Sequence, residues 1–403
     1  MNRVVIGRHC CAQSTHLASY QGIVAAEVLD EITTLARVLK GVRICHINST
    51  AAGGGVAELL SREIPLLRAL EVDADWWIIR GQEQFFTVTK SFHNALQGGQ
   101  YELTDDVQRI YEAQNQESAR LFQERYDVYI VHDPQPAAMV RFRRQPGERW
   151  VWRCHIDSST PNVPVWGFLR PFVAEYDAAV FTMQEFVPED LKLSGLPVIP
   201  PAIDPLSSKN MELPADVARR IVADAEIDLR RPLLLQVSRF DPWKDPMGVI
   251  ETYRMVKRAK PEVQLALVGA MAGDDPEGWT LLEQANAASA QDLDIFVLTN
   301  LTNVGNVEVN AFQRVADVVI QKSLKEGFGL VAGRAGGIPM QVPESYQQFL
   351  VRDIPECAAR ILELLDAPET RDAHGRAGRE HIRRRFLLPR LVRDNLALVH
   401  SLV

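Results

Sequence analysis

The strongest constraint on the fold is the alternation of short apolar runs with longer stretches of helical periodicity. Parallel strands need a long crossover connection, usually a helix, so this alternation favours βαβ units around parallel sheets. In the first half of the chain, the apolar runs expected to form strands are residues 42–47, 76–79, 128–131, 151–154, 178–181 and 198–199. The expected helices are residues 56–69, 105–124 and 167–176. This half is therefore predicted to be an α/β domain.

The composition changes at residues 200–208, which are dense in proline and serine. Because proline fixes φ and disfavours helix in the preceding residue, this segment is interpreted as an extended linker. The pattern then restarts, with expected strands at residues 233–237, 263–268, 295–298 and 318–321. The expected helices are residues 247–259, 279–290 and 307–315, with one or two amphipathic helices in 380–403. The sequence therefore predicts two α/β domains joined by a proline hinge, with a ligand at the carboxyl ends of both sheets.

Length and charge limit the class of protein. The chain has 403 residues, enough for two or three domains of about 150 residues each. The net charge of −8 argues against a general nucleic-acid binder, but a local cationic pocket can still hold a small anionic ligand. No stretch approaches the ~20 apolar residues of a membrane span, and the apolar run at residues 4–6 is too short for a signal peptide. We expect a cytoplasmic protein with no nucleic-acid or membrane partner.

The cysteines indicate neither a disulfide framework nor a zinc site. Their number is odd, and no pair has the spacing of a metal-binding or redox motif. The five are Cys10, Cys11, Cys45, Cys154 and Cys357. We therefore expect reduced thiols and no bound metal.

Two cations follow the expected strand at residues 233–237. Arg239 offers a planar fork of donors and Lys244 a point charge, and both suit phosphate oxygens. Cations held in place stabilise a nucleoside diphosphate as it leaves a sugar, because negative charge grows on it in the transition state. The alternative is a pair of surface cations over the apolar side chains of Phe240 and Trp243. The spacing alone leaves both open.

An acidic residue on a glycine-rich turn follows the expected strand at residues 318–321. Glu326 can hold sugar hydroxyls, and the backbone N–H groups of Gly327, Phe328 and Gly329 can face a ligand. A capping role for Glu326 is the alternative. Together with the cation pair, this turn suggests an enzyme that takes a sugar from a nucleotide donor.

Three glycines, Gly53, Gly54 and Gly55, lie between the expected strand at residues 42–47 and the helix that follows it. They permit positive φ and close backbone approach, and the N-terminus of the helix offers N–H groups to an anion or a sugar. The spacing is not GxGxxG, so a dinucleotide site is disfavoured. A plain tight turn is the alternative.

Two pairs of polar residues follow neighbouring strands of the first domain. His132 and Asp133 follow residues 128–131, and His155 and Asp157 follow residues 151–154. At one sheet edge these side chains can bind sugar hydroxyls or transfer a proton, although either pair can instead cap a turn. The aromatic-rich residues 85–94 suit a sugar platform or a lid, and equally core or a dimer contact.

Taken together, these motifs resemble those of the retaining glycosyltransferases of family 4, in which two Rossmann-like α/β domains face each other across a cleft, the GT-B type of fold. Arg239 with Lys244, and Glu326 with its Gly-Phe-Gly, carry this resemblance. A more specific similarity, to the trehalose glycosyltransferring synthases, extends from about residue 28 to the C-terminus. Its motifs are residues 53–58, 85–97, 131–136, 152–157, 238–244, 274–279 and 309–314.

The resemblance implies an acceptor-side domain at residues 1–203, with a C-terminal helix at about 386–403 packing back on it, and a nucleotide-sugar domain at 204–385. It implies reversible transfer of glucose from a nucleoside diphosphate glucose (UDP, ADP or GDP) to free glucose, giving α,α-trehalose with retention. No cofactor is required, and Mg²⁺ is at most an activator. We expect a homodimer whose partners are its small-molecule substrates.

The resemblance also implies a role for each motif. Arg239 and Lys244 hold the diphosphate, while Glu326 and the backbone of residues 327–329 hold the donor glucose. The acceptor attacks from the front face, and the leaving phosphate takes its proton, so no protein nucleophile is needed. The other groups expected near the ligands are Gly53, Gly54 and Gly55 for the donor, His132, Asp133, His155 and Asp157 for the sugars, and Asn300 and Leu301 for the base.

One departure from the family pattern affects the ribose. Family members usually carry a second glutamate eight positions after the first, and here that position is Arg334. The chain passes from Val331 to residues 332–338 without the expected helix and part of a strand. Either the protein lacks this segment or the printed sequence omits it. No ribose-binding carboxylate can be named.

Two other functions remain open at this stage. A retaining trehalose phosphorylase uses similar chemistry, with inorganic phosphate in place of the nucleotide. If the segment after Val331 is truly absent, a degenerate sugar-binding protein without turnover is the third reading.

Overall fold

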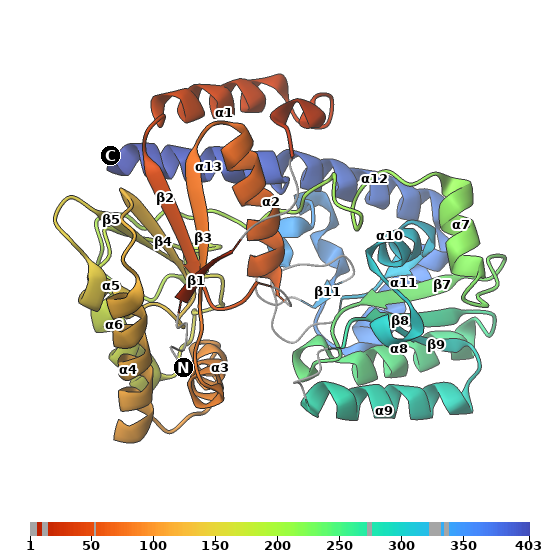
Figure 1. The fold of residues 1–403 in the computed structure, drawn as a ribbon. Coiled ribbons are helices and arrows are strands. Elements are labelled where there is room, and N and C mark those ends of the chain that lie inside the picture. The colour runs from red at the N-terminus through yellow and green to blue at the C-terminus, as the bar shows by residue number, and fades with distance from the viewer. Residues whose placement is uncertain (1–5, 10–14, 52–53, 272–275, 322–331, 334–337) are drawn as a thin grey trace. The chain divides into compact units, whose positions relative to one another are not determined.

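The computed structural model describes residues 6–9, 15–51, 54–271, 276–321, 332–333 and 338–403 (Figure 1). Contacts divide the chain into two compact units. Unit 1 comprises Met1–Asp204 and Arg384–Val403, and unit 2 comprises Pro205–Arg383. Each unit has its own parallel sheet, which confirms the predicted α/β fold class.

Unit 1 contains a six-stranded sheet in the order β1-β3-β2-β4-β5-β6. All neighbouring strands are parallel except β1 and β3. The strands are β1 (Ile6–His9), β2 (Arg43–Asn48), β3 (Asp73–Ile79), β4 (Val128–His132), β5 (Arg149–Arg153) and β6 (Ala178–Val180). The order reverses between β2 and β4, so these two strands flank the switch point where α/β sheets bind ligands.

Helices cover both faces of this sheet (Figure 1). Alternate side chains of the strands, such as Cys45, Ile47 and Tyr129, point into one core with four helices. These are α3 (Glu83–Leu96), α4 (Asp105–Leu121), α5 (Met139–Arg143) and α6 (Val163–Val173). The opposite side carries α1 (Ala26–Val38), α2 (Gly55–Ala69) and α13 (Leu388–Leu402).

Unit 2 contains a four-stranded parallel sheet in the order β10-β7-β8-β9, with a switch point between β7 and β10. Its strands are β7 (Leu233–Val237), β8 (Gln264–Gly269), β9 (Ile295–Thr299) and β10 (Val318–Val319). One face packs on α8 (Pro246–Ala259), α9 (Pro276–Gln291) and α11 (Ile354–Asp366). The other face packs on α7 (Ala215–Ala223) and α10 (Asn306–Val315). Strands β11 (Ala332–Gly333) and β12 (Leu350–Val351) form a separate pair, and α12 (Pro368–Arg385) leads back to unit 1.

Several elements differ from the sequence prediction. Residues 198–199 form only a bridge to Phe181, because no longer apolar run is available to extend a strand. Helix α1 was not predicted, although its buried Ile32 and Ala36 have the spacing of a helix face. The aromatic-rich residues 85–94 belong to α3, whose Phe85 and Phe92 are buried in the core of unit 1, so for these two the core alternative holds.

The proline-rich segment is bound to the start of α13. Ile203 donates its backbone N–H to the Phe386 carbonyl at 2.8 Å, and Leu388 donates its own to Ile203 at 2.9 Å. The guanidinium of Arg390 donates to the carbonyls of Pro200 and Pro201 at 2.9 and 2.8 Å. Because proline has no backbone N–H, the backbone of these two residues can take part in hydrogen bonds only through its carbonyls. Residues 200–203 of the predicted linker are therefore fixed to the start of α13.

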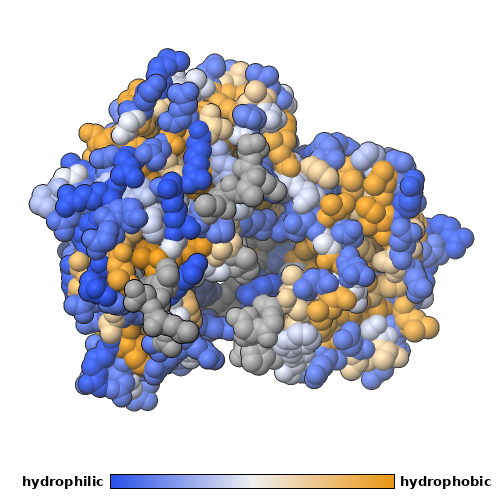
Figure 2. All heavy atoms as spheres, in the orientation of Figure 1, coloured by the Kyte–Doolittle hydropathy of each residue, from blue (hydrophilic) through white to orange (hydrophobic). Residues whose placement is uncertain are grey.

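The surface of both units mixes polar and apolar side chains. Figure 2 shows hydrophobic residues interspersed with hydrophilic ones on the visible face of each unit. Of the described helices, none has the length and apolar character that crossing a membrane requires.

Packing of α13 onto unit 1 generates a stability prediction. Leu391 is 1% exposed, so Leu391→Ala leaves a cavity and should lower the free energy of unfolding by about 2–5 kcal/mol. Urea titration followed by tryptophan fluorescence measures this, since Trp76, Trp150 and Trp152 lie in the sheet of unit 1. The exposed His400 on the same helix is the control, and His400→Ala should change stability by less than about 0.5 kcal/mol. Equal midpoints for both variants would contradict this packing.

Candidate active site

The strand order of unit 1 brings the predicted polar residues to one edge. Strands β2, β4 and β5 are consecutive neighbours, and all run in the same direction. The glycine loop follows β2, His132 ends β4, and His155 follows β5. Parallel pairing therefore places these three groups at the carboxyl edge of one sheet.

The glycine loop leads into the N-terminus of α2. Gly54 is the N-cap residue and has extended backbone, with φ of −162°, so this position does not need positive φ. A Cβ at Gly54 or Gly55 would meet no atom within 4 Å, and both residues are exposed. Neither glycine has a side chain that could cover the first N–H groups of α2. Gly53 lies outside the described residues.

Asn48 and Trp76 anchor this loop, and the sequence analysis missed both. The indole Nε1 of Trp76 donates to Asn48 Oδ1 at 2.7 Å, and Asn48 Nδ2 donates to the Thr50 carbonyl at 2.8 Å. Both side chains are buried, so each polar group needs a protein partner. An asparagine ending an apolar strand just before a glycine loop was the available signal.

Asp133 ties together the chain segments that follow β4 and β5. Its carboxylate accepts from the His155 backbone N–H at 2.8 Å, and its carbonyl accepts from the Trp152 indole at 3.0 Å. Its φ is 62°, a left-handed conformation that aspartate tolerates better than most residues. Burial raises the pKa of Asp133 to about 7, while the His155 N–H and Arg153 lower it. The carboxylate therefore holds the backbone of the neighbouring segment in place. This is the turn-capping role that the sequence left open as the alternative to sugar binding.

His132 and His155 are in direct contact. His132 Nδ1 and His155 Nε2 are 2.9 Å apart, and the planes of the two rings are nearly parallel, at an interplanar angle of 15°. Burial holds the pKa of both imidazoles well below the ordinary value, and Arg153 lowers both further. Both rings are therefore neutral near pH 7.

Asp157 is half-buried and caps its own turn. Its Oδ1 accepts from the backbone N–H of Ser159 at 3.1 Å and from the Ser159 hydroxyl at 2.6 Å. This local bond fixes the carboxylate beside the segment that carries His155.

In unit 2, the two predicted cations lie in the segment that follows β7. Arg239 is exposed and pairs with Asp241 at 3.1 Å, whereas Lys244 is half-buried at the end of a short 3₁₀ turn, Pro242–Lys244. Between them Phe240 is buried in the core. Burial lowers the pKa of Lys244 to about 8, with Asp241 opposing this effect and Arg239 adding to it. The turn thus holds two cations close enough to interact.

The turn that carries Lys244 is fixed by its neighbours. The buried Gln236 donates to the Lys244 carbonyl at 2.8 Å. Asp245 has φ of 48° and caps α8 by accepting from the Gly248 N–H at 3.0 Å. A Cβ at Gly248 would lie 2.2 Å from the Asp245 carboxylate, so only glycine fits this cap. Lys244 is therefore placed directly before a capped helix N-terminus.

Asn300 joins the segments that follow β8 and β9. Its Oδ1 accepts from the Met271 N–H at 2.7 Å, and its Nδ2 donates to the Met271 carbonyl at 3.4 Å. The Asn300 amide is thus engaged by the protein. Leu301 beside it is exposed, and its backbone N–H donates to Thr299 Oγ1 at 3.1 Å.

The acidic turn lies outside the described residues. Glu326, Gly327, Phe328 and Gly329 all fall in it. What the structure does describe is that β10, the last strand before this turn, pairs directly with β7. The last described strand before the acidic segment is therefore the neighbour of β7, the strand that Arg239 follows.

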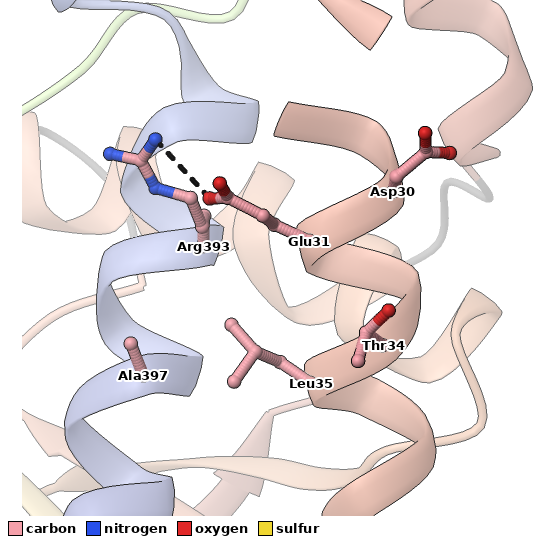
Figure 3. Close-up of a pocket in the computed structure, with 6 residues that line it drawn as sticks. All are labelled: Asp30, Glu31, Thr34, Leu35, Arg393 and Ala397. Atoms are coloured by element: carbon pink, nitrogen blue, oxygen red, sulfur yellow. Dashed lines mark ion pairs between the residues drawn. The ribbon is translucent and has the colours of Figure 1, made fainter. Parts of the chain in front are cut away.

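A groove elsewhere on unit 1 contains none of the predicted residues. It runs between α1 and α13 and is lined by Asp30, Glu31, Thr34, Leu35, Arg393 and Ala397. Figure 3 shows Arg393 of α13 reaching toward Glu31 of α1, a pair 3.5 Å apart. This ion pair joins two helices of the fold and is separate from the sheet edge.

Family models match both halves of the chain. Residues 46–188 match the N-terminal domain of trehalose synthase, and residues 218–381 match the glycosyl transferases group 1. The backbone resembles a crystal structure of an α,α-trehalose 6-phosphate synthase from Burkholderia multivorans, with a TM-score of 0.68, 17% identity, and coverage of 90% of this chain and 99% of that one. This likeness shows the GT-B fold.

Two relatives of similar sequence indicate which family of glycosyltransferases the chain belongs to. A trehalose phosphorylase of Pleurotus pulmonarius is 26% identical over 83% of this chain and 54% of its own length. A trehalose synthase of Rubrobacter xylanophilus is 52% identical over 96% of this chain and 97% of its own length. With both units matched in this way, the chain belongs to the trehalose synthase family, glycosyltransferases of trehalose metabolism with the GT-B fold.

Proposed function

We propose that the protein is a retaining glycosyltransferase that joins glucose from a nucleoside diphosphate glucose to free glucose, giving α,α-trehalose reversibly. The observation that carries this proposal is the cation pair Arg239 and Lys244 on a fixed turn at the carboxyl end of β7. A diphosphate is a strongly anionic leaving group, and fixed cations favour its departure.

The bond changes in this reaction are simple. The bond between the donor C1 and the diphosphate oxygen breaks, and a bond from an acceptor hydroxyl oxygen to C1 forms on the same face. The acceptor proton passes to the departing phosphate. The protein supplies binding, orientation and charge stabilisation and no nucleophile.

The proposal assigns roles to residues of both units. Arg239 and Lys244 bind the diphosphate, Glu326 binds the donor glucose, and Asn300 and Leu301 lie by the base. In unit 1, the neutral His155 contacts a sugar hydroxyl, while Asp133 and Asp157 hold the segment around it. The open N-terminus of α2 at Gly54 and Gly55 approaches the donor.

A trehalose phosphorylase is the second candidate. The specific support is the 26% identity to such an enzyme, together with a cation pair that suits inorganic phosphate as well. The much higher identity to trehalose synthases favours the transferase.

A product assay tests the proposal. The protein is mixed with free glucose and UDP-, ADP- or GDP-glucose, and the products are separated by chromatography. Trehalose and an equal amount of free nucleoside diphosphate are expected from at least one donor. In the reverse direction, trehalose with the matching nucleoside diphosphate should give the nucleoside diphosphate glucose, whereas trehalose with inorganic phosphate should give no glucose 1-phosphate. Glucose 1-phosphate in that reaction, with no trehalose from any donor, would establish the phosphorylase instead.

A folded sample that turns over in neither direction would favour the sugar-binding reading. Intact-protein mass then shows whether the protein has residues after Val331 beyond the printed sequence. A mass equal to that of the printed sequence would support that reading.

Removing one charged side chain of the site should greatly reduce turnover. Lys244→Ala and Glu326→Ala should each lower kcat more than about 10²-fold, since one fixed group of this kind contributes about 3 kcal/mol or more to stabilising the transition state. Lys260→Ala is the matched control, because Lys260 caps the far end of α8 and pairs there with Asp366. Rates in both site variants close to that of Lys260→Ala would refute the assignment, provided circular dichroism shows intact folds.

The lowered pKa of Lys244 predicts the direction in which activity changes with pH. Lys244 is charged below about pH 8 and loses its charge above it, so kcat/KM for the donor should fall as the pH rises through that value. Arginine stays charged throughout, so the profile of Lys244→Arg should lack this fall and stay flat, at whatever rate the variant supports. A wild-type profile that stays flat from about pH 7 to 10 would show that this lysine is not the titrating group.

A further inference from the structure

The indole of Trp76 and the amide of Asn48 form a hydrogen-bonded pair inside unit 1, on the sheet face opposite the core with α3 to α6. Trp76 is 0% exposed and lies within β3, while Asn48 is 3% exposed and ends β2. In the register of these strands, Trp76 stands opposite His46, and Asn48 stands opposite Ile78. The indole therefore reaches diagonally toward the carboxyl edge, where its Nε1 donates to Asn48 Oδ1 at 2.7 Å.

This bond fixes which way round the Asn48 amide lies. An indole N–H can only donate, and a backbone carbonyl can only accept. Oδ1 therefore faces Trp76, and Nδ2 faces the Thr50 carbonyl, to which it donates at 2.8 Å. Reversing the amide would bring two donors together at Trp76 and two acceptors together at Thr50. Trp76 thus acts on the glycine loop through Asn48.

The residues that follow Thr50 have no polar side chain of their own to hold them. Residues 51–55 are alanine and glycine alone, and glycine loses the most backbone entropy when it is ordered. Asn48 supplies a tie from the sheet to the start of this segment. Burying an amide and an indole N–H is costly unless both are paired, so packing by itself gives no reason for polar groups here.

The neighbouring Trp77 provides a contrast. On the opposite face of the sheet, its Nε1 donates to the Tyr126 hydroxyl at 2.9 Å. Trp77 is 8% exposed, and Tyr126 lies just before β4, at the amino edge. Two adjacent buried indoles thus each donate one hydrogen bond. The bond of Trp76 leads to the glycine loop, whereas that of Trp77 leads to the other edge of the sheet.

We propose that Trp76 and Asn48 are positioning residues for the nucleoside diphosphate glucose. Together they hold the entry to the glycine loop, so that the loop approaches the donor in one conformation. The donor rests on the proposed function, whereas the tie between sheet and loop rests on unit 1 alone. A small displacement of a binding loop can lower the rate far more than it lowers stability.

The direct test uses the indole N–H signals in ¹H–¹⁵N spectra of protein labelled with ¹⁵N-tryptophan. The chain has 7 tryptophans, and the signals of Trp76 and Trp77 are assigned by replacing each residue with phenylalanine. UDP-, ADP- or GDP-glucose, at saturation established by calorimetry, should shift the Trp76 signal and leave that of Trp77 in place. An unmoved Trp76 signal with a donor bound, or equal shifts at both indoles, would overturn the proposal.

Asn48→Leu tests the tie without any ligand. Loss of the acceptor should move the indole proton of Trp76 upfield and leave that of Trp77 unchanged. An unchanged Trp76 signal would show that the hydrogen bond is absent in solution. If the wild-type protein binds none of the three donors, the proposed function fails and the role for the donor fails with it, while this spectrum still decides the tie.

Trp76→Phe and Trp77→Phe are a matched pair of variants, because each keeps a buried aromatic ring and removes one hydrogen-bonded indole N–H. Both should lower thermal stability to a similar extent. Trp76→Phe should lower kcat/KM for the donor about 10-fold or more, and Trp77→Phe should stay within about 2-fold of wild type. Equal values of kcat/KM in the two variants would leave Trp76 with a packing role.

A double variant separates one shared tie from two independent effects. If Trp76 and Asn48 act through the same chain of hydrogen bonds, Trp76→Phe combined with Asn48→Leu should lose no more kcat/KM for the donor than the worse single variant. Independent effects would instead multiply. Multiplied losses would therefore contradict the proposal.

Discussion

Parallel strand pairing is the constraint on which the candidate site depends. Each described residue assigned to it lies at or just after the carboxyl end of a parallel strand, from Gly54 after β2 to Leu301 after β9. In unit 1 the order β2-β4-β5 makes neighbours of segments that are far apart along the chain: 86 residues separate His46 of β2 from His132 of β4, and 23 separate His132 from His155 after β5. Both separations exceed the roughly dozen residues that a parallel crossover needs. In unit 2 the same rule puts the strand before the acidic turn next to the one before the cation pair.

Beneath this edge, unit 1 has a buried polar layer that joins sheet, helices and linker. Asn395 of α13 donates to the carboxylate of Glu63 of α2 at 2.6 Å, and burial raises the pKa of Glu63 to about 7. Arg390 of the same helix binds the carbonyls of Pro200 and Pro201. Arg153 donates to the Ile199 carbonyl at 2.5 Å. Buried polar groups of this kind require specific partners, so the layer specifies one position for α13 on the sheet, where apolar packing alone would tolerate several.

Part of the candidate site could be predicted from local sequence, and part could not. Cations on the turn after β7, and polar residues after β4 and β5, were predictable because the ends of parallel strands carry function in α/β folds. The hydrogen-bond partners of each side chain could not be predicted. Asp133 and Asp157 were candidates for sugar binding, and both carboxylates are engaged in backbone hydrogen bonds. The aromatic residues of α3 suited a platform, but Phe85 and Phe92 fill the core. Composition cannot distinguish these cases, because the same residue types serve both.

From the sequence by itself, the two α/β units and the placement of the cation pair follow, because hydrophobic periodicity and proline are local signals that survive without tertiary information. Tertiary structure alone decided that α13 packs on unit 1, that Asn48 and Trp76 anchor the glycine loop, and that His46 joins His132 and His155 in one row. These contacts link residues far apart in the chain through strand order and register. A shift of one residue in any of these strands would turn its side chains to the opposite face, so the row exists only in the folded sheet.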